Sequence, residues 1–102
     1  MYKLIITSTL HEELDSIILY ISENLKNPTA ATHFLDEVSK CYGYLKTNPQ
    51  IYGFCSDDRL RKQGYRKAVI KNYILVYRVD EKNNIVYVLH IFYGKRDYEK
   101  LI

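Results

Sequence analysis

Side chains that could engage a phosphate group are concentrated in the second half of this 102-residue chain. Residues 1–58 carry a net charge of −4 and residues 59–102 one of +7, and no aspartate or glutamate occurs between Arg59 and Val79. The cations of that stretch are Arg59, Arg61, Lys62, Arg66, Lys67, Lys71 and Arg78, and Lys95 and Arg96 follow further along. A segment with one sign of charge indicates a surface that meets an anionic partner, either a nucleic acid or an acidic protein. A solvated basic sheet surface gives the same pattern, so charge alone does not decide between them.

Three predicted strands would position these cations. Tyr65–Lys71, Tyr73–Val79 and Ile85–Tyr93 are rich in β-branched and aromatic residues, which favour strands. Asn72 tolerates a positive φ and predicts a tight reversal between the first two strands. The polar residues 80–84 form a connector of hairpin length before the third. The second half of the chain therefore predicts an antiparallel meander.

Side chains alternate between the two faces of a strand, so the residues of the meander can be assigned to faces. The face toward the rest of the chain would hold Leu75, Tyr77 and Val79 of the middle strand and Leu89, Ile91 and Tyr93 of the last. The opposite, open face would hold Lys67, Arg78, His90, Phe92 and Arg96. Such a face could bind a phosphodiester by charge and a base by stacking, or it could dock an acidic helix of a partner. A histidine on a sheet is more often structural than catalytic, so His90 alone is weak support for catalysis.

The first half of the chain begins with a strand and a helix. Residues 2–7 predict the strand. Apolar residues then recur at helical spacing, which predicts a helix from about Thr9 to Lys26. Thr9 and Glu12 have the spacing of a capping box at the start of this helix.

A second helix follows directly, with Asn27 as its N-cap, Pro28 at its first position and Pro49 as its limit. Residues 50–63 predict a loop, and residues 97–102 a short helical turn or tail. The order of elements is βααβββ. Because the two helices must bury their apolar stripes, we expect a single α+β domain over residues 1–102. In it a helical hairpin packs on one face of a mostly antiparallel sheet.

Several functional classes are not indicated. No apolar run approaches the roughly 20 residues that span a bilayer, and no leader with a cleavage site is present, so we expect a cytoplasmic protein with no membrane partner. Cys41 and Cys55 do not form a CxxC pair, and His11, His33 and His90 lack the spacing of metal ligands, so we expect neither a metal nor a cofactor. Ser-His-Asp, HExxH, Walker and GxGxxG patterns are missing from the sequence.

Two stretches of the meander have a distinctive form: residues 73–80 read YILVYRVD, and residues 86–97 read VYVLHIFYGKRD. Together with the Leu45-x-x-x-Pro49 helix exit and the order of elements, they resemble the RelE/ParE superfamily of type II toxin–antitoxin toxins over nearly the whole length. The resemblance implies a small toxin held inactive by a co-expressed, partly disordered antitoxin. RelE-like members cut mRNA in the ribosomal A site with sheet lysines and arginines and often a C-terminal tyrosine or histidine. ParE-like members inhibit DNA gyrase and need no nuclease site.

Carried over residue by residue, the match to the nuclease branch is incomplete. Lys67 and Arg96 stand where RelE-like toxins have functional cations, but Ile74 and Ile102 stand where they have an arginine and a tyrosine. We therefore expect a ParE-like toxin that inhibits DNA gyrase and is neutralised by a cognate antitoxin. The candidate target-binding residues for this function are Arg61, Arg66, Arg78 and Lys95.

Two alternatives stay open. The first is a RelE-like endonuclease that acts on ribosome-bound mRNA, with His90 or Tyr93 in place of the missing polar groups. The catalytic candidates of such an enzyme would be Lys67, His90, Tyr93 and Arg96. The second alternative is an inactive, toxin-like binding module.

Overall fold

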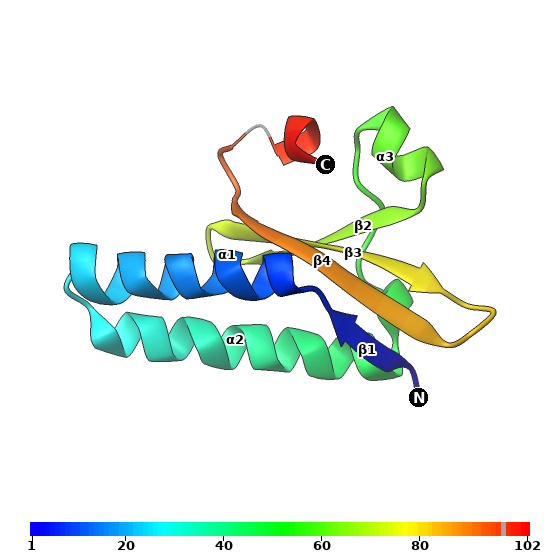
Figure 1. Cartoon of the computed structure of the whole chain (residues 1–102). Coiled ribbons are helices and arrows are strands. Elements are labelled where there is room, and N and C mark those ends of the chain that lie inside the picture. The colour runs from blue at the N-terminus through cyan, green and yellow to red at the C-terminus, as the bar shows by residue number, and fades with distance from the viewer. Residues whose placement is uncertain (97) are drawn as a thin grey trace.

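The computed structural model describes residues 1–96 and 98–102. Its strands are β1 (Lys3–Ile6), β2 (Tyr65–Ile70), β3 (Tyr73–Asp80) and β4 (Ile85–Tyr93), and its α-helices are α1 (Ser8–Leu19), α2 (Pro28–Thr47) and α3 (Asp58–Lys62). A π-helical turn (Tyr20–Asn24) extends α1, and 3-10 turns span Pro49–Ile51 and Tyr98–Leu101. Figure 1 shows the α1–α2 hairpin beside the sheet. The predicted α+β class and the βααβββ order are confirmed, with the short α3 as an addition.

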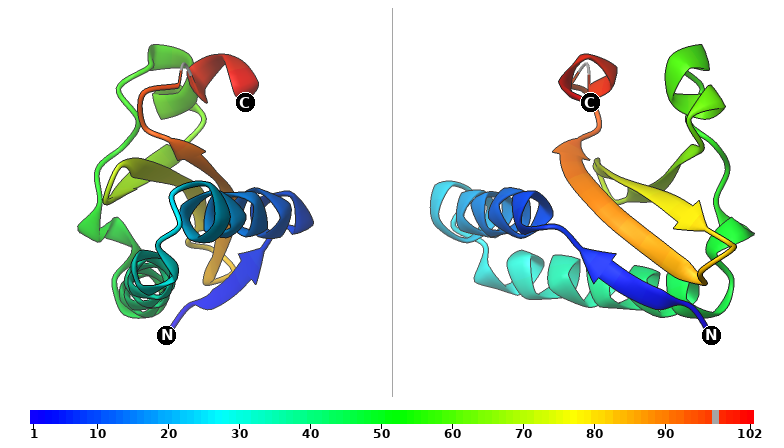
Figure 2. Two further views of the ribbon diagram at one scale, coloured as in Figure 1. Left: turned by 90° about the vertical axis from the view of Figure 1, so that its left-hand side faces the viewer. Right: turned by 45° about the vertical axis from the view of Figure 1, so that its right-hand side comes forward.

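The four strands form one sheet in the order β1-β4-β3-β2. The predicted meander of β2, β3 and β4 is antiparallel throughout, whereas β1 pairs in parallel with β4, with Lys3 opposite Ile85 and Ile6 opposite Val88. Parallel neighbours cannot be joined by a tight turn, and the chain makes this long connection through the hairpin and the meander. Figure 2 shows β1 alongside β4.

Apolar side chains are buried on both faces of the sheet. The main core lies between the sheet and the hairpin, and it includes Phe34, Val38 and Leu45 of α2 with Leu75 and Tyr77 of β3. We call the face turned away from the hairpin the second face. It carries a smaller apolar cluster, in which Leu60 of α3 and Tyr98 of the C-terminal turn pack on Ile74, Val76 and Phe92. The hairpin and the pair formed by α3 and the C-terminal turn lie on opposite sides of the sheet (Figure 2).

The two long helices are capped at their N-termini by different means. Asn27 caps α2 as predicted, because its Oδ1 accepts the N–H of Ala30 at 3.1 Å. The predicted capping box of α1 is wrong: Thr7 Oγ1 accepts the N–H of Leu10 at 3.1 Å and donates to the Leu89 carbonyl at 2.8 Å. Thr7 takes this place because its hydroxyl can cap the helix and bind β4 at the same time.

Part of the predicted loop over residues 50–63 is helical. The Asp57 carboxylate accepts the N–H of Leu60 at 3.0 Å and so begins α3, and the Leu60 side chain is fully buried in the second-face cluster. A capping aspartate and one buried leucine are enough to order this single turn, which has too few residues to show a helical period.

A β-bulge in β4 changes which side chains face the hairpin. Val76 pairs with His90 but Tyr77 pairs with Val88, so Leu89 is an extra residue in the ladder. Val88 therefore packs in the main core, and the prediction that Leu89 does so is wrong. The predicted inward positions of Leu75, Tyr77, Val79 and Ile91 are confirmed.

The reversal between β2 and β3 centres on Lys71, which adopts a φ of 55°, and not on Asn72 as predicted. Asn72 instead accepts the N–H of Gly94 through its backbone carbonyl at 2.7 Å. A Cβ at Gly94 would lie 3.0 Å from that oxygen, so this close approach favours glycine.

Candidate functional site: the second face and the adjoining groove

The face predicted to be open is partly covered. The C-terminal turn places Tyr98 over Phe92, with ring centroids 6.4 Å apart, and both residues are buried. Arg59 of α3 holds this turn by donating to the carbonyls of Glu99 at 2.6 Å and Ile102 at 3.2 Å. The prediction of Phe92 as an exposed stacking platform is therefore wrong, because the last residues fold back over it.

Two of the predicted target-binding arginines are engaged within the protein. Arg66 donates from Nη1 to the Tyr52 carbonyl at 2.7 Å, and its guanidinium carbon lies 3.9 Å from the ring centroid of Phe54. Arg61 forms an exposed ion pair with Asp58 one turn earlier in α3. An exposed pair of this kind is weak and can be exchanged for another anion, whereas Arg66 is fixed as an anchor beside β2.

The other predicted cations keep more freedom. Arg78, Lys95 and Arg96 are exposed, and Lys67 is half-buried. The guanidinium carbon of Arg78 lies 5.3 Å from the Tyr65 ring centroid, and that of Arg96 lies 5.8 Å from the Phe92 ring centroid. Cation–π contacts orient an arginine without using its N–H donors, so both side chains can still bind an anion.

Two of the four catalytic candidates, His90 and Arg96, meet at the Phe92 ring, and the other two lie apart from them. Lys67 pairs with Val76, and Val76 pairs with His90, so Lys67 and His90 share the second face but are two strands apart, roughly 10 Å at the backbone. Tyr93 and Arg96 line a groove between the hairpin and the end of β4, and Phe92 of the second-face cluster lines it too. Simultaneous contact of all four with one scissile phosphate is not favoured by this arrangement.

Glu13 of α1 is a site residue that the sequence analysis did not identify. Its Oε1 accepts the backbone N–H of Ile91 at 3.1 Å, and its Oε2 lies 3.3 Å from His90 Nδ1. The His90 ring stacks on Phe92, with centroids 5.0 Å apart and an interplanar angle of 17°. Glu13 lies on the helical face between the core and solvent, a position at which a glutamate is ordinarily solvated, so no sequence signal distinguishes it.

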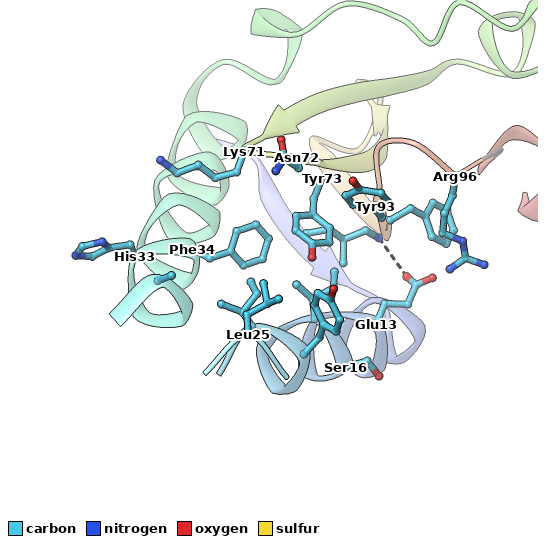
Figure 3. A pocket seen from close by; sticks show the side chains of 16 residues that line it. Glu13, Ser16, Leu25, His33, Phe34, Lys71, Asn72, Tyr73, Tyr93 and Arg96 are labelled. Carbon is cyan, nitrogen blue, oxygen red and sulfur yellow. Dashed lines mark hydrogen bonds between the residues drawn. The ribbon is translucent and has the colours of Figure 1, made fainter. Parts of the chain in front are cut away.

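A groove of about 870 Å³ runs between the far end of the hairpin and the end of β4. Most of its lining is apolar or aromatic, from Ile17, Tyr20, Ile21, Leu25, Ala30, Phe34, Tyr73, Ile91, Phe92 and Tyr93. Figure 3 shows Glu13 and Arg96 near one end of the groove, and His33 and Lys71 at the other. The π-helical turn, a feature frequent at functional sites, contributes Tyr20 and Ile21.

The buried thiols and phenols are not activated for chemistry. Burial raises the pKa of the Cys41 thiol to about 11 and also raises that of Cys55. Burial, and then the neighbouring Cys55, raises the pKa of Tyr98 to about 12. All three groups are therefore protonated at neutral pH. Within residues 1–96 and 98–102, no group of three His, Cys, Asp or Glu side chains is placed to hold a metal ion, and no helix is long and apolar enough to cross a membrane.

Residues 4–98 match the model of one protein family, described as the ParE toxin of type II toxin-antitoxin system, parDE. The chain belongs to the ParE toxin family. It is thus the toxin member of a type II toxin–antitoxin pair, and the predicted membership of the RelE/ParE superfamily is confirmed. No curated protein sequence matches the chain.

Solved structures extend the likeness to the whole fold. The chromosomal ParDE system from P. aeruginosa is similar with a TM-score of 0.74 and 19% identity, covering 93% of this chain and 98% of that one. The toxin–antitoxin complex RelBE2 from Mycobacterium tuberculosis is similar with a TM-score of 0.61 and 18% identity. The match covers 90% of this chain and 96% of that one. The archaeal RelE–RelB complex from Pyrococcus horikoshii OT3 is similar with a TM-score of 0.61 and 15% identity. The match covers 93% of this chain and 97% of that one. At these identities the likeness establishes the fold and not the target.

Proposed function

We propose that this ParE-family toxin inhibits DNA gyrase by binding it, and that a cognate antitoxin holds the toxin inactive in the cytoplasm. The observation that carries the proposal is the apolar cluster on the second face. Ile74 is buried in this cluster and Ile102 packs against it. These are the two positions where the nuclease branch has an arginine and a tyrosine. An apolar floor cannot stabilise the charge that develops on a phosphorane-like transition state, so it favours binding over cleavage.

The exposed cations supply the binding surface for gyrase. Arg78, Lys95 and Arg96 are exposed, and Arg61 joins them once it leaves Asp58. Arg66 contributes by holding the segment before α3 in place. Arginine makes bidentate, charge-assisted hydrogen bonds to carboxylates, so an acidic surface of the target suits this set.

The apolar groove is the site we propose for the antitoxin. Its aromatic lining fits the apolar stripe of an amphipathic helix, and Lys71 and Arg96 at its rim favour acidic side chains on that helix. The three similar structures are described as toxin–antitoxin systems or complexes. Binding of a partner to the native toxin alone would raise its melting temperature by mass action.

Expression in bacteria tests the toxin function. Induction without an antitoxin should arrest growth, and co-expression of the product of a neighbouring small open reading frame should restore growth and co-purify. The variant Arg96→Ala should weaken gyrase binding by roughly 1–3 kcal/mol, the range for one charge-assisted contact. Unimpaired growth with folded protein present in the lysate would instead identify an inactive binding module.

One observation favours the second candidate function, cleavage of ribosome-bound mRNA. Glu13 holds His90 through Nδ1, which leaves Nε2 without a hydrogen-bond partner in the described part of the chain. A histidine oriented by a carboxylate is suited to general acid–base catalysis. Codon-phased cuts in translated mRNA that disappear in His90→Gln would establish this function and overturn the first.

A further inference from the structure

Cys55 lies beneath the C-terminal turn, and the proposed function leaves this thiol without a role. Its side chain is fully buried in the second-face cluster, which also contains Tyr98 of the turn and Leu60 of α3. The Cys55 backbone N–H donates to the Tyr65 carbonyl at 2.9 Å, so the cysteine is fixed beside the edge of β2. Access to the thiol from solvent therefore requires the turn or α3 to move.

Arg59 and apolar packing hold the turn over the thiol. The Arg59 guanidinium donates to the carbonyls of Glu99 and Ile102, and both hydrogen bonds are exposed. Tyr98 is 4% exposed, and its hydroxyl has the Cys55 thiol as a neighbour but no oxygen or nitrogen partner within residues 1–96 and 98–102. A thiol is a weak hydrogen-bonding group, so the buried hydroxyl is poorly satisfied, and opening of the turn would return it to water. The closed position is thus opposed by a group that it buries.

The electrostatic surroundings of the thiol would differ between the closed and the open turn. In the closed structure burial raises the pKa of Cys55 and the carboxylates of Glu99 and Asp57 add to this, whereas the charge of Lys67 lowers it. Opening would remove burial together with Glu99, which belongs to the turn, and of the two charges that remain Lys67 has the larger effect. A cation beside an exposed thiol favours the thiolate, which is the reactive form. The closed turn therefore makes the thiol unreactive, and the open turn activates it.

We propose that Cys55 is a gated thiol-modification site, at which a low-molecular-weight disulfide such as oxidised glutathione reacts once the C-terminal turn opens. The Cys55 thiolate attacks one sulfur of the disulfide, so that an S–S bond between Cys55 and one glutathione forms and the S–S bond of the reagent breaks. The second glutathione leaves as a thiolate and takes up the proton that Cys55 has lost. The disulfide itself is the oxidant of this step.

The adduct holds the turn open. The Cys55 side chain is fully buried in the closed structure, so the close-packed space beneath Tyr98 has no room for a tripeptide on the sulfur. Ile74, Val76 and Phe92 share the cluster with Tyr98 and would gain exposure when the turn is displaced. Modification would therefore change the shape of the second face. This inference goes beyond the proposed function and does not depend on which target the toxin has.

Exchange with oxidised glutathione at neutral pH, followed separately at Cys41 and Cys55 by peptide mass spectrometry, tests the gate. Cys41 is the internal control, since it is 3% exposed in the main core and reacts only when that core opens. Arg59→Ala should raise the rate at Cys55 about tenfold, the factor expected for two exposed hydrogen bonds, and leave the rate at Cys41 unchanged. Addition of Lys67→Gln to this variant should slow the Cys55 reaction about threefold, because less thiolate is present.

Lys62→Ala is the matched control, because Lys62 is an exposed cation of the same helix, α3. It should leave both rates unchanged, and circular dichroism confirms that each variant is folded. Carboxypeptidase then tests the effect of the adduct. Wild-type toxin treated with oxidised glutathione should lose its C-terminal residues faster than the reduced protein, whereas the same treatment of Cys55→Ala should leave its digestion unchanged.

Equal acceleration at Cys41 and Cys55 in Arg59→Ala would indicate global unfolding and would overturn the proposal. A Cys55 rate in Arg59→Ala equal to that of wild type, an equal acceleration by Lys62→Ala, or a rate that Lys67→Gln leaves unchanged would also overturn it. So would digestion by carboxypeptidase that the adduct does not alter. Gyrase is absent from all of these assays, so each of these failures leaves the proposed inhibition of gyrase standing.

Discussion

Replacement of Glu13 by alanine should destabilise the fold through the loss of a single part-buried hydrogen bond. Glu13 Oε1 accepts the N–H of Ile91, a residue that is 1% exposed, so the alanine variant removes the side-chain acceptor of this donor. An orphaned buried donor costs about 1–3 kcal/mol. The pair between Glu13 Oε2 and His90 Nδ1 is partly exposed, with side chains 22% and 24% accessible, and adds at most about 1 kcal/mol.

Glu13→Gln separates these two contributions. A glutamine can still accept from Ile91 through its amide oxygen but carries no charge toward His90. We expect the alanine variant to lose about 1–3 kcal/mol and the glutamine variant less than about 1 kcal/mol, measured by urea unfolding followed by circular dichroism. Each kcal/mol corresponds to about 4–8 °C in Tm for a domain near this size.

Glu12→Ala supplies the control for helix propensity, because Glu12 is exposed on the neighbouring position of α1. It should stay within about 0.5 kcal/mol of the parent. Equal destabilisation by Glu13→Gln and Glu13→Ala would contradict this assignment, since the charge and not the hydrogen bond to Ile91 would then be responsible.

The structure supports three further predictions. Tyr77→Phe should lower the free energy of unfolding in urea by about 1–3 kcal/mol, because it removes a buried hydroxyl that donates to the Pro49 carbonyl at 2.6 Å. A loss below about 0.5 kcal/mol would mean that this hydrogen bond contributes little. Arg59→Ala should free the C-terminal turn and speed its removal by carboxypeptidase, whereas unchanged digestion would show that Tyr98 alone holds it. Stability should fall in alkali: the pKa of Cys41 rises from 9.0 to about 11 on folding, so its contribution is intact below about pH 9 and lost toward pH 11. Cys41→Ala should flatten that part of the curve, and an unaltered curve would contradict the assignment.

The meander was predictable because β3 and β4 are long and dense in β-branched and aromatic residues, and the shorter β2 lies next to β3 in the sequence. The start of α2 was predictable because Asn27 and Pro28 are local signals that act alone. The cap of α1 was not, because Thr7 competes with Thr9 and the decision lies in a bond from Thr7 to Leu89, 82 residues away in the sequence. Local patterns do not carry tertiary contacts of this kind.

The candidate site was predicted only in part for the same physical reason. The bulge at Leu89 reverses the alternation along β4 and moves residues between faces, and no composition signal marks it. The sequence predicts Phe92 on an open face, because no local pattern indicates that the C-terminal turn covers it. The turn is held there by hydrogen bonds from Arg59, and its Tyr98 ring stacks on Phe92. Arg78 was placed correctly, since β3 is regular up to that residue.

We propose that this toxin acts on gyrase and not on mRNA, and one parallel experiment tests this directly. Purified toxin can be added in parallel to a gyrase supercoiling assay and to a translation reaction analysed by primer extension. We expect loss of supercoiling, accumulation of gyrase-cleaved linear DNA and intact ribosome-bound mRNA, with the effect on gyrase reduced in Arg96→Ala. Codon-phased cuts in the translated mRNA, together with gyrase activity that the toxin leaves unchanged, would contradict it.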